Sequence, residues 1–235
     1  MPAMAVMASR FTPAPPTSIA NCEAYYNADV GTTIATGVSQ WNDQSGNSNT
    51  LTQGTAAQQP AFVSSWRNGK AAIQFDGGDD SLWRATLSSG TIAQPTTMLL
   101  VFESANESVK AMVDSRDASN RQLLANDSGW IGSYAGAYIQ NARTWASTES
   151  CIQTAVFNGA SSSNRVLRHG LSTLTGSGTA GSGSINGLTI GNAFSDGAGT
   201  AGKIASFSLY RRTLNASEIL MLETWGKAYY AITTA

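Results

Sequence analysis

Apolar and polar residues alternate with a period of two in several short segments of the chain. In the segment 71–75, the apolar positions on one side are Ala71, Ile73 and Phe75. In the segment 203–210, they are Ala205, Phe207 and Leu209. Successive side chains of a strand point to opposite faces of a sheet, so this spacing predicts strands with one buried face.

Other segments are predicted to be strands from their apolar content and from the turn residues between them. The segment 97–102 is apolar on both sides, which predicts a central strand. The segment 151–157 ends at Asn158-Gly159 and precedes 164–169, which predicts a hairpin or a short strand–loop–strand unit. With further strands at 187–191 and 203–210, we expect about a dozen strands at the spacing of a β-sandwich.

One segment near the C-terminus has helical rather than strand spacing. Its recurring apolar residues are Ile219, Leu222 and Trp225. Asn215 precedes this run and Glu218 follows three residues later, which is the order of a capping box. We therefore expect a short helix that lies on the sandwich, with Gly226 ending or interrupting it.

Length and composition favour one β domain preceded by an arm. The chain has 235 residues, of which 12% are charged and 23 are glycine, and this length suits an undivided sandwich. We expect this domain to span residues 21–235. Residues 1–20 are predicted to form an extended N-terminal arm because prolines fix an extended backbone. The glycine-rich segment 176–183 is predicted to be a flexible loop between strands.

Charge and apolar runs argue against two classes of partner. The formal net charge is −1, so the chain lacks the basic surface of a nucleic-acid-binding protein. No run approaches the roughly 18–20 apolar residues of a membrane span. The first ten residues have no basic region before a short apolar stretch, so we expect no signal peptide and synthesis in the cytoplasm of the host.

The cysteines and the histidine give little indication of a metal or redox site. The two cysteines, Cys22 and Cys151, fit one disulfide or two buried free thiols equally well. His169 is the only histidine and is flanked by Arg168 and Gly170, so we expect it at the surface. One histidine and two distant cysteines do not make a zinc site.

Four stretches of the sequence carry motifs whose order along the chain is informative. They are 38–53, with W-x-D-x-S-G-N, then 60–82, with F-D-G-x-D-D, then 97–104, and 188–219, which closes with a strand and the start of a helix. In this order they resemble the laminin G-like jelly roll of the concanavalin A-like superfamily, of the type found in phage structural proteins. The resemblance covers most of residues 24–230. It implies an all-β jelly-roll sandwich of two antiparallel sheets with a short C-terminal helix.

The two polar motifs are interpreted mainly as structural. Trp41 is expected to bury its ring while Asp43, Ser45 and Asn47 hydrogen-bond the backbone of the turn. In the second motif, the residues expected to permit positive φ are Gly77 and Gly78. Its acidic residues, expected to satisfy amides between two strands, are also the weak calcium candidates: Asp76, Asp79 and Asp80. Calcium needs about six to eight oxygens, which three carboxylates do not guarantee, so we expect no cofactor.

Enzymes of this fold have signatures that the chain lacks. Hydrolases carry an E-x-D-x-x-E strand with two carboxylates about 5 Å apart, whereas Glu103 and Glu107 have another spacing. Glu218 and Glu223 fall on the predicted helix. The R-x-E-x-R and Q-x-H patterns of lyases are absent, as are a nucleophile elbow and a phosphate-binding loop. From these absences we predict that the chain is not an enzyme.

The segment 130–145 offers candidate groups for a glycan. Its aromatic residues are Trp130, Tyr134, Tyr138 and Trp145, and its nearby hydrogen-bonding residues are Asn141 and Arg143. Sugar rings stack on exposed aromatic faces of this kind. The same even spacing would also fill one face of a strand inside the core, which is the interpretation we favour from the sequence.

Two functions follow from these observations. The first is a virion component, such as a phage capsid decoration protein, that binds the major capsid protein through its arm and forms homo-oligomers. The arm residues expected to make that contact are Phe11, Pro13, Pro15 and Pro16. The alternative is a lectin-like carbohydrate-binding module that binds a glycan through loops at one rim of the sandwich.

Overall fold

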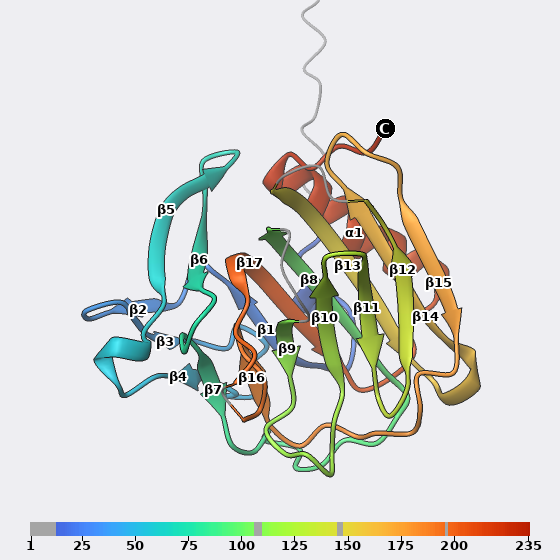
Figure 1. The fold of residues 1–235 in the computed structure, drawn as a ribbon, viewed down its shortest axis with the longest axis horizontal. Helices are drawn as coiled ribbons and strands as arrows, with labels where there is room; N and C mark the ends of the chain where they lie inside the picture. The colour runs from blue at the N-terminus through green and yellow to red at the C-terminus, as the bar shows by residue number, and fades with distance from the viewer. Residues whose placement is uncertain (1–12, 106–109, 145–147, 196) are drawn as a thin grey trace, which may run out of the picture.

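Two antiparallel β-sheets pack face to face in this protein (Figure 1). The computed structural model describes residues 13–105, 110–144, 148–195 and 197–235. Strands make up both layers, and one helix near the C-terminus lies on the outside. The predicted all-β sandwich with a short C-terminal helix is confirmed.

Sheet A has eight strands, and its long strand β17 organises the centre. The second half of β17 pairs with β1, whereas its first half pairs with β6, so these two strands follow one another along the same edge of β17. In spatial order, with β1 added last, the strands are β15 (Leu174–Gly178), β14 (Ser162–Arg168), β13 (Glu149–Phe157), β8 (Thr96–Ser104), β17 (Ala201–Tyr210), β6 (Lys70–Asp76), β5 (Ala61–Arg67) and β1 (Cys22–Asn27).

Sheet B has nine strands, most of them short. In spatial order they are β12 (Tyr138–Ala142), β11 (Trp130–Tyr134), β10 (Leu123–Asp127), β9 (Lys110–Asp114), β16 (Leu188–Ile190), β7 (Leu82–Arg84), β4 (Leu51–Thr52), β3 (Val38–Trp41) and β2 (Thr32–Ile34). Three single-turn 3₁₀ helices lie between strands or before them: η1 (Pro16–Ser18), η2 (Ala56–Gln58) and η3 (Gly159–Ser161).

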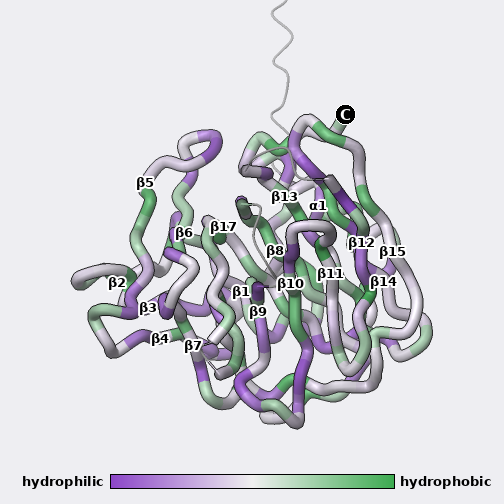
Figure 2. The backbone as a smooth tube through the Cα atoms, in the orientation of Figure 1, coloured by the Kyte–Doolittle hydropathy of each residue, from purple (hydrophilic) through white to green (hydrophobic). Residues whose placement is uncertain are grey.

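The main core lies between the inner faces of the two sheets. The predicted inward residues Ala71, Ile73 and Phe75 of β6 are all buried there. Along many strands the hydropathy changes from one residue to the next, as Figure 2 shows. Strand β8 is apolar on both sides because its alternate residues face this core and the helix that covers sheet A, which confirms it as a central strand.

Strand β17 departs from the simple alternation that the sequence predicts. Phe207 and Leu209 face the core between the sheets, but Ala205 lies on the opposite side of sheet A. The pairing of β17 with β8 shifts register between Ile204 and Ser206, and this irregularity moves Ala205 to the outer face. The prediction that Ala205 shares a face with Phe207 and Leu209 is therefore wrong.

Helix α1 (Ala216–Tyr230) covers the outer face of sheet A. It begins with the predicted capping box, in which the Asn215 side chain accepts from the Glu218 amide and the Glu218 side chain accepts from the Asn215 amide. Gly226 neither ends nor interrupts the helix. A Cβ atom at Gly226 would lie 2.9 Å from Cδ1 of Ile152, so glycine lets the helix approach the sheet closely. Within the described residues, no helix is both long and apolar enough to cross a membrane.

The first polar motif forms a turn held by side chains. The Asp43 carboxylate accepts from the amides of Tyr25, Ser45 and Asn49. Asn47 donates to the carbonyl of Glu23 on β1, which fastens the turn to sheet A. The ring of Trp41 is fully buried, so this motif has the structural role that the sequence predicts.

The structure answers two questions that the sequence leaves open: the state of the two cysteines and the conformation of the glycine-rich segment. Cys22 on β1 and Cys151 on β13 are free thiols, and burial raises the pKa of Cys151 to about 12. The glycine-rich segment 176–183 is only partly a loop, since its first three residues belong to β15 at the edge of sheet A. This part of the prediction is wrong because backbone pairing with β14 requires no particular side chain.

Candidate functional site

Three aromatic rings gather on the outer face of sheet B and define what we call the aromatic face: Trp130, Tyr134 and Tyr138. Trp130 and Tyr134 alternate with the buried Ile131 along β11, so both point away from the core. Tyr138 on β12 pairs directly with Tyr134 and is 41% exposed. The ring centroids of Trp130 and Tyr138 are 5.1 Å apart, and those of Tyr134 and Tyr138 are 4.7 Å apart.

A glycine between the two rings of β11 shapes the aromatic face. A Cβ atom at Gly132 would lie 2.9 Å from Cζ3 of Trp130 and 2.6 Å from the carbonyl oxygen of Ile139. The indole therefore lies over the backbone of Gly132 instead of standing away from the sheet. This arrangement leaves the rings close to the strands that carry them.

Two arginines extend the aromatic face toward the middle of sheet B. The guanidinium of Arg121 lies 5.8 Å from the ring centroid of Tyr134 and 4.9 Å from that of Phe194. Arg116 lies 4.5 Å from the ring centroid of Trp83 and donates to the carbonyl of Phe194. Rings and guanidinium groups thus alternate across the outer face of sheet B.

The charge of Arg121 is balanced by the buried carboxylate of Asp114. Its Nη2 lies 2.8 Å from Oδ2 of Asp114, whose side chain is completely buried. Burial raises the pKa of Asp114, and hydrogen bonds from Arg121 oppose that rise. The pair holds Arg121 in place and neutralises the charge of its guanidinium.

The other predicted glycan residues do not join the aromatic face. On β12, the side chain of Tyr138 points outward, whereas that of Asn141 points inward and donates to the carbonyl of Asn164. Arg143 is buried and forms an ion pair with Glu149, at 3.0 Å. Trp145 lies outside the described residues. The sequence left open whether Asn141 and Arg143 bind a glycan or the protein itself. In the structure the strand period turns Asn141 inward, and both side chains bind the protein itself.

The rings do not lie in the main core between the sheets, and two of them pack instead against a small cluster on the outer face of sheet B. Trp130 and Tyr134 are half-buried against a small outer cluster that includes Ala125 and Ala193, and Tyr138 is more exposed. Spacing alone missed four residues that border this surface: Trp83, Arg116, Arg121 and Phe194. They come from separate segments, so no local pattern in the sequence could have grouped them.

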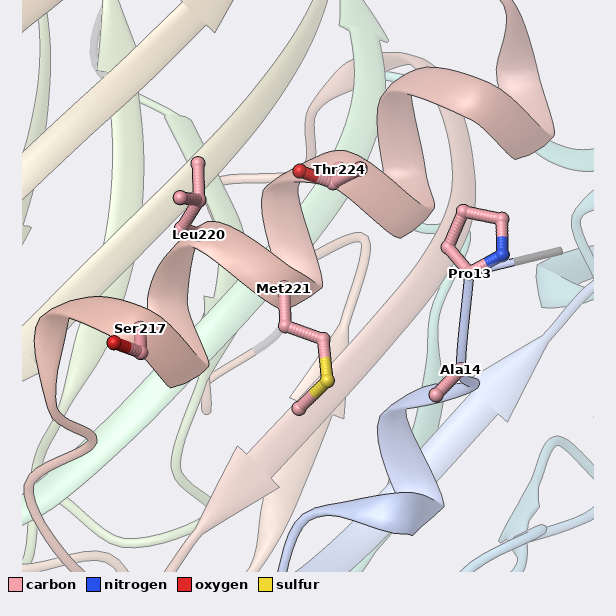
Figure 3. A pocket seen from close by; sticks show the side chains of 6 residues that line it. All are labelled: Pro13, Ala14, Ser217, Leu220, Met221 and Thr224. Carbon is pink, nitrogen blue, oxygen red and sulfur yellow. The ribbon is translucent and has the colours of Figure 1, made fainter. Parts of the chain in front are cut away.

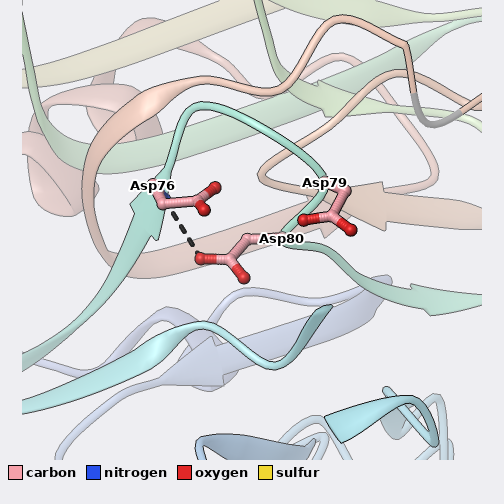
Figure 4. Close-up of side chains that lie close together, drawn as sticks. All are labelled: Asp76, Asp79 and Asp80. Carbon is pink, nitrogen blue, oxygen red and sulfur yellow. Dashed lines mark hydrogen bonds between the residues drawn. The ribbon is translucent and has the colours of Figure 1, made fainter. Parts of the chain in front are cut away.

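The three calcium candidates lie together in the turn between β6 and β7 (Figure 4). One oxygen from each of Asp76, Asp79 and Asp80 lies within 4.8 Å of the others. Asp80 accepts from the amide of Asp76, and burial, followed by the neighbouring Asp76, raises the pKa of Asp80. Gly77 has the predicted positive φ, at +87°. Gly78 does not have positive φ, so the prediction for Gly78 is wrong. These contacts stabilise the turn, and the expectation that these weak candidates hold no calcium stays a prediction.

The described part of the N-terminal arm lies on its own domain. Pro13 and Ala14 line an apolar pocket of 270 Å³ with Leu220 and Met221 of α1 (Figure 3). Pro16 is buried, and its carbonyl accepts from the Tyr210 hydroxyl at 2.9 Å. Pro15 accepts through its carbonyl from Ser18. Phe11 lies outside the described residues.

The sequence matches no known family model and no curated protein. The fold has clear likenesses among solved structures. A GH54 α-L-arabinofuranosidase soaked with a cyclic sulfate inhibitor has a TM-score of 0.63 and 10% identity, over 89% of this chain and 63% of that chain. Trypanosoma rangeli sialidase in complex with sialic acid has a TM-score of 0.54 and 17% identity, over 92% of this chain and 36% of that chain.

One similar structure has nearly the same extent as this chain. It is Domain 4 of AbnA, a GH43 extracellular arabinanase from Geobacillus stearothermophilus, in complex with arabinotriose. The TM-score is 0.57 at 12% identity, over 86% of this chain and 97% of that chain. The protein thus shares a β-sandwich fold with these chains, which is consistent with the jelly-roll type that the sequence resembles.

These likenesses overturn the prediction that the chain is not an enzyme. Parts of chains named arabinofuranosidase and sialidase share its fold, namely 63% and 36% of each chain. The prediction depended on missing motifs, but glycosidases use more than one set of catalytic groups, including a tyrosine nucleophile in sialidases. The missing motifs therefore do not exclude hydrolysis of a glycosidic bond.

Proposed function

We propose that the protein binds glycan chains through the aromatic face of sheet B. The observation that carries this proposal is the contact of three partly exposed rings, with centroids 4.7 and 5.1 Å apart, on one open sheet surface. Flat rings offer an apolar surface to the C–H groups of a sugar, and the tyrosine hydroxyls offer hydrogen bonds at the edge. The similar module in complex with arabinotriose supports a saccharide ligand.

The charges on this surface favour a neutral glycan. Arg121 borders the rings, but its charge is balanced by Asp114 at 2.8 Å. A carboxylate sugar would have to compete with Asp114 for the guanidinium. We therefore expect arabinotriose and arabinofuranosyl-xylobiose to bind more tightly than sialic acid, and we call these three compounds the saccharide panel.

Calorimetric titration of the full chain with the saccharide panel tests the proposal. Binding of a neutral oligosaccharide to the aromatic face should be lost in Tyr138→Ala and Trp130→Ala. Leu220→Ala is the matched control, since Leu220 is a 63% exposed apolar side chain on α1. Equal affinities for the wild type and both aromatic variants would refute the proposed face. Chromatography of the titrated samples shows in the same experiment whether the saccharide is cleaved.

The virion role predicted from the sequence is not favoured by these findings. The similar structures named above are those of an arabinofuranosidase, an arabinanase and a sialidase. Attachment to a major capsid protein, a location in a phage particle and homo-oligomer formation therefore stay predictions. Mass measurement of the purified chain, alone and mixed with virions, tests them.

A further inference from the structure

A row of polar side chains crosses the outer face of sheet A, and we call it the polar row: Gln74, Lys203, Glu103 and Ser150. They lie on β6, β17, β8 and β13, and each is the direct cross-strand partner of the next. The neighbouring positions on the same face are Ala72, Val101 and Ile152, which are buried in the cluster that includes the apolar residues of α1. The polar row therefore begins where the apolar surface of sheet A ends.

Glu103 is the centre of the polar row. Its Oε1 lies 2.5 Å from Nζ of Lys203, and its Oε2 accepts from the Trp66 indole at 2.9 Å and from the Ser150 hydroxyl at 3.4 Å. Burial alone would raise the pKa of Glu103, but the hydrogen bonds from Lys203 and Trp66 outweigh it and lower the pKa. The carboxylate is therefore ionised and fixed in one orientation at neutral pH.

Two adjoining cavities open on either side of Glu103. One, of 370 Å³, is lined by Glu103, Ser150, Arg67 at the end of β5 and His169, which follows β14. The other, of 410 Å³, is lined by Glu103, Lys203 and Gln74. Each volume lies within the range of about 300–1,000 Å³ that is typical of small-ligand sites. Because both cavities share Glu103, one ligand can reach its carboxylate from either side.

The wall behind the polar row is held rigidly. Arg67 donates to the carbonyls of Tyr230 and Ala231, at 3.2 and 3.0 Å, and to the Ser150 hydroxyl at 3.3 Å. Its Nη2 also lies 3.0 Å from Nε2 of His169, which is exposed as predicted. These contacts occupy the guanidinium, so Arg67 positions Ser150 and the C-terminal segment rather than offering a free charge to a ligand.

We infer that the polar row is a second saccharide site, which recognises adjacent hydroxyl groups of a neutral glycan unit. A carboxylate offers about four lone-pair positions, and Lys203, Trp66 and Ser150 use three of them. One sugar hydroxyl can donate to Glu103 while the next accepts from Lys203 or from the exposed Gln74 amide. Asp76 lines the same cavity, so a negatively charged ligand would meet two carboxylates there.

This inference deepens the proposed function and places a second site on the opposite sheet. A protein with one site on each outer face can bind two glycan segments at once. The inference rests on the proposed carbohydrate binding but not on the aromatic face itself. The experiment must therefore report on the two surfaces separately.

Nuclear magnetic resonance of the tryptophan indole groups makes that distinction. The chain has six tryptophans, and Trp66 and Trp130 report on the two sites. Their indole N–H signals are assigned with Trp66→Phe and Trp130→Phe. On titration with the saccharide panel, both signals should shift, and two equivalents should bind. A shift at Trp130 alone would refute the second site, and a shift at Trp66 alone would refute the aromatic face. No shift at either would refute both.

Glu103→Gln and Lys203→Met test the polar row directly. Each should weaken the affinity measured from the Trp66 signal by at least tenfold and leave the affinity measured from the Trp130 signal unchanged. Lys227→Met on α1 is the matched control, because it removes a lysine from a surface away from both cavities. An unchanged titration at Trp66 in both variants would refute the role of Glu103 and Lys203. If either variant fails to fold, the signals of the wild type decide the question.

Discussion

The outer faces of the two sheets have opposite coverings. Sheet B presents the rings of Trp130, Tyr134 and Tyr138 to solvent, at least in part. Sheet A buries its apolar outer face under α1 and leaves the polar row at one end uncovered. The comparison shows that one sandwich can make two kinds of binding surface, one by stacking and one by directed hydrogen bonds.

The difference arises from what each sheet packs against. On sheet A, Leu99, Val101 and Ile152 form a broad apolar surface that requires a cover, and α1 provides it. On sheet B, the outer cluster consists mainly of small residues such as Ala111 and Ala125, and the rings themselves cover it. The aromatic face is therefore both a small satellite core and a candidate binding surface.

The largest expected effect comes from comparing two tryptophans. Trp225 on α1 is 4% exposed and packs on sheet A, whereas Trp130 is half-buried on sheet B. Trp225→Ala should lower the free energy of unfolding by about 3–5 kcal/mol, because it leaves a cavity under the helix. Trp130→Ala should cost far less stability and abolish glycan binding at the aromatic face. Urea denaturation of both variants checks this, and equal losses would contradict the difference between the faces.

The next effect is the pH dependence of stability, in which two carboxylates on the outer side of sheet A, Glu103 and Glu223, should differ. The lowered pKa of Glu103 stabilises the fold above the unfolded pKa, and this stabilisation is lost as the pH falls through the folded value. Glu103→Gln should therefore lower the free energy of unfolding by about 1.5–3 kcal/mol at pH 7 and have little effect in acid.

Glu223 under α1 should show the opposite dependence. Burial raises its pKa, so the folded state binds the proton more tightly than the unfolded state, and stability falls as the pH rises through that range. Glu223→Gln should flatten this part of the curve. Denaturation at a series of pH values measures the free energy of unfolding of both variants. If it changed with pH in the same way in both, the opposite pKa shifts of Glu103 and Glu223 would be contradicted.

The sequence predicts local features of this molecule well and distant pairings poorly. The capping box at Asn215 and Glu218 and the turn at Asp43 depend on residues close in the chain, and both are found. Trp130, Tyr134 and Tyr138 lie side by side as their local spacing suggests, whereas Trp145 lies outside the described residues and Asn141 turns inward with the strand period. The polar row could not be found, because Gln74, Glu103 and Lys203 are adjacent only through strand order and register.

A smaller effect is expected where the aromatic face depends on the backbone below it. In Gly132→Ala, the new Cβ would meet the Ile139 carbonyl oxygen at 2.6 Å and the Trp130 ring at 2.9 Å. Overpacking of this kind costs about 1–3 kcal/mol of stability. The indole must move, so glycan affinity should fall at the aromatic face while the polar row is unaffected. Indole resonances of Trp130 and Trp66 measure this, and unaltered binding at Trp130 would show that the position of the ring is unimportant.

The smallest effect should distinguish stacking from hydrogen bonding. Tyr138→Phe keeps the most exposed ring of the aromatic face and removes only its hydroxyl. If stacking provides most of the affinity, the loss should be about 0.5–1.5 kcal/mol, the range for one hydrogen bond, and well below the loss in Tyr138→Ala. Calorimetric titration with arabinotriose compares the two variants. Equal losses in both would mean that the hydroxyl, not the ring, binds the sugar. The aromatic face would then resemble the polar row in its chemistry, and the contrast between the sheets would be one of position alone.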